Sequence, residues 1–596
     1  MQWPWQGGNA VGARGVWVDP ESITLARVGV SGLPVVNAVL DRLGFHGLVA
    51  GHLGHPGSRR RLAAAEAIGV LVRALALGRQ PLYGLGSWAS GYDPVLLGLS
   101  PTEGHLVNDD RVGRALDALF GADRASLTTA LSLAAVVMFD ISLDELHNDS
   151  TSICLYGAYR RSEQAGEDRA PRPARGHSKD HRPDLKQLVW ILTTSADGAV
   201  PITYRLADGN TEDSTTHIAT WESCRGLAGR ADFLYIADCK LATRDNMNHI
   251  AGEGGRFLTV MPRSRKEDEA GRAWLAREPV AWVEVARRPG RAKTDPDEAW
   301  WAVAAPDLSL EGYRIVWVRS SSKQAQDAAA RTEHIARAAA ALSVLAGTLA
   351  SPRCRLKTAV AVTDAAKAVI AKSGASRWVN ATVAEEVTSH YRQERRGRPG
   401  PNTRYRQIDH STFTLTWFTD AAQVGLDAAS DGCFPLITND HEMTEAALLA
   451  AYKAQPHLER RHAVLKGILE AAPIELKSET RIDAFGFCLY AALLVHALIE
   501  RELRRAMAAA GISELPLYYE DRACTAPTAT RVLEVLDPLA RTTVLHRGQV
   551  LTVVAPALSP LQNELLSLLG TPLGPYGAEK SERPNSAQEP WSRCGT

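Results

Sequence analysis

The stretch after about residue 128 most constrains the fold, because short apolar runs alternate there with segments of helix length. Residues 188–194 and 200–205 are two strand-like runs, and Ala196-Asp197-Gly198 between them favours a tight hairpin turn. Residues 233–237 form a short apolar run typical of a strand buried on both faces. A hairpin followed by strand–helix alternation predicts an α/β fold in which helices cover a mixed sheet.

Helical patterns flank this stretch on both sides. Residues 59–77 carry apolar residues at helical spacing, and Asn108 is placed to cap a helix over 111–120. After residue 430, helices are expected over 444–453, 458–470 and 480–505. Six segments follow from these changes of pattern: a mostly helical N-terminal domain (1–125), the first part of an α/β domain (126–260), an insertion (261–430), the second α/β part (431–515), a small C-terminal unit (516–573) and a disordered tail (574–596).

Charge and cysteine content narrow the classes of function. Lys and Arg total 67, as do Asp and Glu, so bulk charge alone cannot hold an acidic partner. Any nucleic-acid site must therefore be a local basic patch. The eight cysteines are scattered without a C-x-x-C pair, which argues against a disulfide framework and a four-thiolate zinc site.

The chain is expected to be cytoplasmic and without a membrane partner. Its first residues hold no long apolar run of the kind found in secretory signals. The most apolar stretches, 128–139 and 485–499, are shorter than the roughly 18–20 residues that a membrane span requires.

Three acidic residues stand where a metal site could form. Asp149 precedes the strand-like run 150–156, Asp238 closes the run that begins at 233, and Glu459 lies in a late helix. Three converging carboxylates would make an all-oxygen site for Mg²⁺ or Mn²⁺, and two such ions can activate the nucleophile of a phosphodiester reaction. The alternative is that these residues only flank strands and cap helices.

The helix around Glu459 adds polar neighbours. Tyr452, Gln455, Glu459 and Lys466 fall within about 60° of one helical face at 100° per residue. Such a face would present a carboxylate to metal and three polar groups to phosphate oxygens. Pro456 can restart the helix, which would separate Tyr452 from the others. An ordinary solvated helix face is the other interpretation.

Two basic segments are candidate DNA contacts. Residues 158–187 hold eight Lys or Arg against five acidic residues, and 391–406 hold six arginines against Glu394 alone. Arg396-Gly397-Arg398-Pro399 resembles the core of an AT-hook, whose arginines enter narrow A·T minor grooves. Solvated loops remain the alternative for both segments.

These residues, taken in order, resemble the DDE transposases of bacterial insertion sequences. The resemblance is to insertion-sequence family four, the Tn-five-like group, and within it to the sixteen-thirty-four-type branch. The matching stretches are Gly32-Leu33-Pro34, Leu43-Gly44, 108–117 (NDDRVGRALD), 147–152 (HNDSTS), 176–187 (GHSKDHRPDLKQ), Asp208-Gly209-Asn210 with Asp213, Ile236-Ala237-Asp238, 431–439 (DGCFPLITN) and the Tyr452–Gln455–Glu459–Lys466 pattern.

The resemblance implies a ribonuclease-H-like fold in which Asp149, Asp238 and Glu459 bind two Mg²⁺ (or Mn²⁺) ions and catalyse. It implies that Tyr452 and Lys466 contact DNA. Gln455 replaces the arginine of the wider group, so it would donate to phosphate without a charge. We also assign DNA contacts in the basic segments, at Lys179, Arg182, Lys186, Arg396 and Arg398.

The resulting prediction is a DNA transposase. It would bind the inverted-repeat ends of its element as a homodimer, hydrolyse strands there and join the 3′-hydroxyl ends to target DNA. Two alternatives stay open: a ribonuclease-H-like nuclease or resolvase that cuts without strand transfer, and a DNA-binding protein that has lost catalysis.

Overall fold

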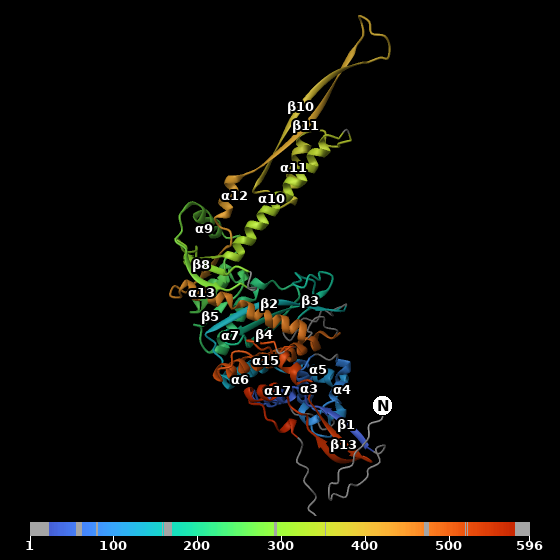
Figure 1. The fold of residues 1–596 in the computed structure, drawn as a ribbon, viewed down its shortest axis with the longest axis vertical. Coiled ribbons are helices and arrows are strands. Elements are labelled where there is room, and N and C mark those ends of the chain that lie inside the picture. The colour runs from blue at the N-terminus through green and yellow to red at the C-terminus, as the bar shows by residue number, and fades with distance from the viewer. Residues whose placement is uncertain are drawn as a thin grey trace, which may run out of the picture. The chain divides into compact units, whose positions relative to one another are not determined.

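The computed structural model describes residues 23–54, 62–78, 82–157, 159, 170–290, 295–351, 353–469, 476–518, 520 and 522–577 (Figure 1). The chain forms two compact units. Unit 1 combines Met1–Tyr235 with Ala454–Thr596, and unit 2 is Ile236–Lys453. Unit 1 thus joins segments that the sequence analysis treated as separate domains, because the N-terminal and C-terminal helices pack on each other.

Four strands form the sheet of unit 1. Their order is β4 (Pro201–Ala207), β3 (Lys186–Ser195), β2 (Glu145–Leu155) and β5 (Leu234–Ile236), and the chain passes into unit 2 at β5. β2 pairs antiparallel with β3, which pairs antiparallel with β4. Together with the surrounding helices this makes the mixed α/β architecture that the pattern predicts.

The predicted hairpin is confirmed, whereas the start of β2 differs from the prediction. Ser195 N donates to Val200 O at 2.9 Å, and Gly198 has a φ of 79°, as a tight turn requires. β2 begins at Glu145, not at residue 150, so Asp149 lies within the strand instead of preceding it. The polar residues before Asp149 are drawn into the strand because they pair with the last residues of β3.

A long central helix forms the core of the helical part of unit 1. α15 (Glu479–Ala509) packs against α1 (Leu33–Arg42), α3 (Ala64–Ala76), α5 (Asp109–Phe120) and β4. The predicted cap of α5 is confirmed, because Asn108 Oδ1 accepts from Arg111 N at 2.9 Å. The other α-helices described in unit 1 are α2 (Phe45–Leu53), α4 (Leu85–Ala89), α6 (Arg124–Phe139), α7 (His217–Ala228), α14 (Gln455–Ala463), α16 (Ala529–Leu536) and α17 (Pro560–Leu568).

α15 is long and apolar enough to cross a membrane by length and composition. Within the described residues, 94% of its apolar window is buried inside the protein. The surrounding helices and β4 therefore already cover the apolar surface that a lipid environment would otherwise cover.

A second, three-stranded sheet joins the two ends of the chain. Its order is β1 (Ile23–Gly29), β13 (Ala540–His546) and β14 (Gln549–Val554), with antiparallel pairing throughout. β1 was not predicted from the sequence. The described start of the predicted disordered tail is ordered: Tyr576 is buried and its hydroxyl donates to Ser31 O at 3.0 Å. Residues 578–596 lie outside the described residues.

Unit 2 holds a sheet and a projecting ribbon. The sheet has the order β6 (Arg256–Val260), β12 (Cys433–Thr438), β9 (Arg314–Ser320), β8 (Glu298–Ala304) and β7 (Val283–Arg288). Its helices are α8 (Arg244–Gly252), α9 (Lys266–Arg277), α10 (Ser321–Leu349), α11 (Ala359–Lys372), α12 (Ala421–Ala428) and α13 (Glu445–Lys453). The ribbon consists of β10 (Val379–Gln393) and β11 (Tyr405–Thr419), which pair along their whole length.

Candidate active site

Asp149 is the predicted catalytic residue of β2, and cationic or basic groups lie on two sides of it. Lys179 Nζ is 3.6 Å from its Oδ1, and His462 Nε2 is 3.6 Å from its Oδ2. The amide of Ser150 donates to Oδ1 at 2.8 Å. The carboxylate is 22% exposed, so it is partly open to solvent while its position is constrained by these neighbours.

Lys179 lies between two carboxylates. Its ammonium is 3.4 Å from Asp213 Oδ2 in addition to its contact with Asp149, and it donates to Ser150 O at 2.5 Å. The hydroxyl of Ser150 in turn donates to Asp213 Oδ1 at 2.7 Å. A cation thus already bridges Asp149 and Asp213 at this place, which marks it as strongly negative. The role of Lys179 as a DNA contact remains a prediction.

Glu459 is carried by α14, a helix that packs on β2. Gln455 Nε2 donates to Asn148 O at 3.0 Å, and Gln455 Oε1 lies 3.0 Å from His147 Nδ1. His462, seven residues after Gln455, lies beside Asp149. Gln455, Glu459 and His462 follow the i, i+4, i+7 spacing of one helical face. Exposed Glu459 therefore stands between two residues that contact β2.

A buried arginine holds α14 in place. Arg461 Nη1 donates to Glu500 Oε2 at 2.7 Å, and its other nitrogens donate to Ala199 O and Gly198 O at 2.9 and 2.8 Å. The side chains of Arg461 and Glu500 are only 4% and 6% exposed. Burial lowers the pKa of Arg461 below its ordinary value, and the charge of Glu500 opposes that shift. One side chain thus ties α14 to the β3–β4 turn and to α15.

His462 is a neutral neighbour of Asp149. Burial lowers the pKa of His462 to about 3, and the charges of Lys179 and Lys466 lower it further in the same direction. At 3.6 Å its contact with Asp149 exceeds an ordinary hydrogen bond. His462 was not predicted from the sequence, although its position three residues after Glu459 places it on the same side of the helix.

The single helical face predicted for Tyr452, Gln455, Glu459 and Lys466 is wrong, because the helix is interrupted twice. α13 ends at Lys453 and α14 begins at Gln455, with Pro456 in its first turn. Val464–Ile468 then forms a π-helical turn that contains Lys466. Pro456 restarts the helix as its missing N–H allows, and the π turn changes the angular spacing beyond Ala463.

The outer members of that pattern have separate surroundings. Lys466 Nζ lies 2.5 Å from Asp180 Oδ1, and the thiol of Cys154 donates to Asp180 Oδ2 at 3.5 Å. In unit 2, the half-buried ring of Tyr452 lies 5.8 Å from the ring of Phe434. The predicted DNA contacts of Tyr452, Gln455 and Lys466 remain predictions.

Asp238 belongs to unit 2 and follows β5 by two residues, at the end of a buried strand as predicted. Its carboxylate accepts from Lys240 N at 2.9 Å and so caps a short 3₁₀ turn, Cys239–Leu241. Thr259 donates from its hydroxyl to Asp238 O at 2.6 Å. β6 therefore holds the backbone of Asp238.

The remaining predicted DNA contacts differ in their partners. Arg182 forms a bidentate pair with Asp184 at 2.8 and 2.7 Å, which raises its pKa. Lys186 Nζ donates to Tyr159 O at 3.0 Å. Arg396 and Arg398 are exposed in the loop that joins β10 to β11, and neither forms an ion pair with any residue that the structure describes. Residues 158 and 160–169 of the first basic segment lie outside the described residues.

Across the described part of the chain, no three His, Cys, Asp or Glu side chains are grouped as a metal-binding set. The chemistry of the predicted donors nevertheless suits a hard cation. Asp149, Asp238 and Glu459 offer carboxylate oxygens, the ligands that Mg²⁺ and Mn²⁺ take. The ammonium of Lys179 between Asp149 and Asp213 shows that this position accepts positive charge.

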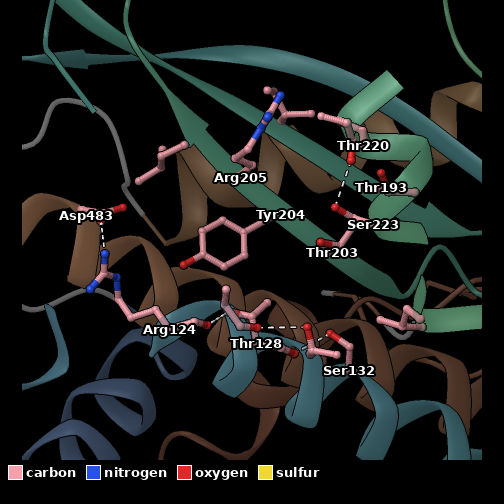
Figure 2. Close-up of a pocket in the computed structure, with 16 residues that line it drawn as sticks. Arg124, Thr128, Ser132, Thr193, Thr203, Tyr204, Arg205, Thr220, Ser223 and Asp483 are labelled. Atoms are coloured by element: carbon pink, nitrogen blue, oxygen red, sulfur yellow. Dashed lines mark hydrogen bonds and ion pairs between the residues drawn. The ribbon is translucent and has the colours of Figure 1, made fainter. Parts of the chain in front are cut away.

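A separate cavity of about 310 Å³ lies in unit 1 between the edge of the sheet and neighbouring helices (Figure 2). The ring of Tyr204 and the Arg124–Asp483 ion pair, 2.8 Å long, border it. Burial raises the pKa of Asp483, and Arg124 opposes this shift. Other lining residues are Thr128, Ser132, Ile191, Thr193, Thr203, Arg205, Thr220 and Ser223.

This cavity is not the place of Asp149. Ile191 and Thr193 line the cavity, and their side chains share one face of β3. Asp149 pairs with Leu192, between them, and neither Asp149 nor Leu192 is among the residues that line the cavity. The helical hydroxyls also have partners: Ser132 and Thr220, for example, donate to Thr128 O and Thr216 O at 2.7 and 2.9 Å. The cavity therefore carries no assignment to the predicted chemistry.

Comparison with known proteins adds the following. A family model described as a domain of unknown function (DUF4277) matches residues 27–133, from the end of β1 into α6. No curated protein matches the chain. Among solved structures, the chain is similar to the cryo-EM structure of a piggyBac transposase synaptic complex with hairpin DNA. The two are 7% identical with a TM-score of 0.34, over 85% of this chain and 78% of that one.

Proposed function

We propose that this protein is a DNA transposase that cleaves the inverted-repeat ends of its own element and transfers their 3′-hydroxyl ends into target DNA. The observation that carries the proposal is the packing of α14 on β2. Gln455 contacts Asn148, and His462 contacts Asp149, so the strand with the first predicted carboxylate and the helix with the last lie together. The ordered series of motifs supplies the third carboxylate, Asp238.

The proposed fold of the catalytic part is ribonuclease-H-like. The antiparallel β4-β3-β2 strands, continued by β5, support it. In this proposal Asp149, Asp238 and Glu459 would hold two Mg²⁺ or Mn²⁺ ions. Bound there, the ions would make water and then a 3′-hydroxyl nucleophilic and would stabilise the leaving oxygen.

The protein's own residues would position the DNA strand. Lys179 carries positive charge beside Asp149, and Lys466 does so beside Asp180. Each of these two ammonium groups can release its carboxylate and bind a phosphate oxygen of DNA, since carboxylate and phosphate are both anionic acceptors. Gln455 already uses its amide on Asn148 O and His147. It would therefore orient β2 against α14 instead of clamping a phosphate.

The rigid setting of α14 supports catalysis by positioning. Arg461 and Gln455 fix the helix at both ends of its inward face. Holding a catalytic group within a fraction of an ångström of its working place supplies much of the rate of such reactions.

We further propose that the protein acts as a homodimer on paired ends in the cytoplasm.

Supercoiled plasmid that carries the DNA flanking the coding sequence tests the proposal. Incubation with Mg²⁺ should give nicks that end in 3′-hydroxyls at the borders of inverted repeats, and then joined products in target DNA. The variant Glu459→Gln is the matched control and should give neither. Cleavage without joined products would favour the nuclease or resolvase, and end binding without cleavage would favour the inactive DNA-binding protein.

A further inference from the structure

The β10–β11 ribbon of unit 2 is an arm with a supported base and an exposed outer half. At the base, Val379 and Leu415 pack with Ala338 and Leu342 of α10 and with Ile370 of α11 in a small apolar core. Asp427 reinforces it by binding Arg377 at 2.7 Å. The ribbon residues of this core extend no farther along β10 than Val383.

Beyond Val383 both faces of the ribbon are mostly exposed. Val387, Tyr391 and Tyr405 are 54%, 66% and 51% exposed. At about 3.3 Å per residue, β10 continues for about 33 Å from Val383 to Gln393. Figure 1 shows the paired strands running out past α11. An exposed two-stranded ribbon of this length gains little stability by itself, so a partner bound along it would stabilise it.

The tip of the arm is strongly basic. Arg392 and Arg406 are directly paired across the strands, so two like charges lie on one face. Such cross-strand pairs destabilise a ribbon unless an anion compensates them. The loop adds four more arginines, Arg395, Arg396, Arg398 and Arg404, against the single carboxylate of Glu394. None of the six arginines forms an ion pair with any residue in the described ranges.

Hydrogen bonds within the loop that joins β10 to β11 give it a defined conformation. Glu394 N donates to Arg404 O at 3.0 Å, and Thr403 closes a turn with Gly400 through bonds of 3.0 and 2.7 Å. The residues from Gln393 to Arg404 surround an open hollow of about 710 Å³. On the face opposite Arg392 and Arg406, Tyr391 and Tyr405 are diagonal neighbours. The six arginines, with one carboxylate among them, form a local basic surface of the kind that binds nucleic acid.

We propose that the β10–β11 ribbon is an arm that binds duplex DNA through its arginine tip. A two-stranded ribbon fits the major groove, which is about 12 Å wide, and arginines can reach phosphates or an adjoining minor groove from there. Arginine suits the task because its planar fork binds phosphate oxygens in pairs. Only the choice of DNA as the polyanion rests on the proposed function.

The test measures DNA binding by the full-length protein that carries Glu459→Gln. This variant is expected not to cleave DNA, so binding by the arm is measured without cleavage. The tip variant changes Arg395, Arg396 and Arg398 to Gln. The matched control changes Arg353, Arg355 and Lys357 to Gln, three exposed cations between α10 and α11. A mixed-sequence 40-base-pair duplex is titrated from 50 to 200 mM salt.

If each tip arginine holds one phosphate, the slope of log K against log salt falls by about 2.7 in the tip variant. Over this salt range, wild-type affinity then drops about 40-fold more than that of the variant. Hydroxyl-radical footprinting should show the loss of one protected patch, with the rest unchanged. The control variant should keep the wild-type slope and footprint.

A second variant guards against misfolding of the loop. It replaces residues 394–404 by Asn-Gly, a two-residue turn that suits a hairpin. It should lose the same patch. An unchanged slope and footprint in both tip variants would overturn the proposal. Loss of a dimer in sedimentation, with an unchanged footprint, would also overturn it and would assign the ribbon to contact between copies. If the tip variants lose the footprint but the wild-type protein shows no cleavage, the proposed transposase function is refuted and the DNA-binding role of the arm stands.

Discussion

Arg461 and Glu500 form a buried ion pair, 2.7 Å long, that joins the helix of Glu459 to the core helix α15. Glu500 also accepts from Ala529 N at 3.1 Å, so the pair connects to the first residue of α16. A buried pair is weak evidence for stability in itself, but the loss of one partner leaves a buried charge with weaker compensation. Without Arg461, the nearest cation to Glu500 is Arg504, at 3.5 Å. The orientation of the predicted active-site helix therefore depends on Arg461.

Arg461→Met should lower the free energy of unfolding by about 3–5 kcal/mol, because buried Glu500 then loses its partner at 2.7 Å and keeps only Arg504 at 3.5 Å. Chemical denaturation measures this difference. Arg460→Met is the control, since Arg460 is exposed on the same helix, and it should stay within about 0.5 kcal/mol of wild type. The double variant Arg461→Met, Glu500→Met should recover part of the loss. Equal stability of the two single variants would contradict the role of Arg461.

Asp149→Asn, Asp238→Asn and Glu459→Gln should each reduce cleavage and strand transfer at least about 100-fold, because each removes an anionic metal ligand at nearly constant volume. Folding and end binding should stay nearly intact. Gel assays of plasmid nicking measure the effect. Asp144→Asn and Asp232→Asn are matched controls on exposed carboxylates, which are 75% and 71% exposed. Wild-type cleavage by any of the first three variants would show that the wrong carboxylate was chosen.

Cleavage should require Mg²⁺ or Mn²⁺, because the predicted ligands are all carboxylates. Ca²⁺ should support DNA binding with little cleavage, since its looser coordination positions water poorly. A metal series in the same nicking assay, with binding followed in parallel, measures both effects. Strong cleavage in the presence of EDTA would refute the metal mechanism.

Unfolding should depend on pH through His217. Burial lowers the pKa of His217 to about 4 from an ordinary value of 6.5, and Asp213 opposes the shift. Between these values the unfolded chain binds a proton that the folded protein excludes. Stability due to His217 is therefore complete above pH 6.5 and decreases as the pH falls towards 4, by up to about 1.4 kcal/mol per pH unit.

Denaturation of His217→Gln between pH 4 and 7 measures this contribution. The free energy of unfolding of the variant should depend less steeply on pH than that of wild type. The other buried histidines are the same in both proteins. His46→Gln, at an exposed position, should keep the wild-type slope. Equal slopes in wild type and His217→Gln would contradict the lowered pKa of His217.

The AT-hook-like loop should discriminate base composition. If Arg396 and Arg398 enter a minor groove, Arg396→Ala with Arg398→Ala should weaken binding more on A·T-rich than on G·C-rich duplex, because A·T minor grooves are narrower and more negative. Equal losses on both duplexes would instead indicate phosphate contacts alone. Affinity measured on the two duplexes at one salt concentration decides between these outcomes.

The features that the sequence alone determined are local ones. Asn108 caps α5 because its side chain reaches the amide of Arg111, three residues away. The Ala196-Asp197-Gly198 turn forms because its glycine accepts a left-handed backbone. The predicted strand-like run 188–194 lies within β3. In each case the physical cause lies within a few residues of its effect, so the pattern of neighbouring residues was sufficient.

Tertiary structure decided the features that depend on distant partners. Pairing with β3 extends β2 so that Asp149 lies within it, and β13 provides the partner that makes β1 a strand. The outer half of β10 shows no apolar alternation because both its faces are exposed. Its strand conformation therefore depends on pairing with β11. Burial made His462 a neutral neighbour of Asp149. Packing across the fold supplies the free energy of these arrangements, and no short stretch of sequence contains it.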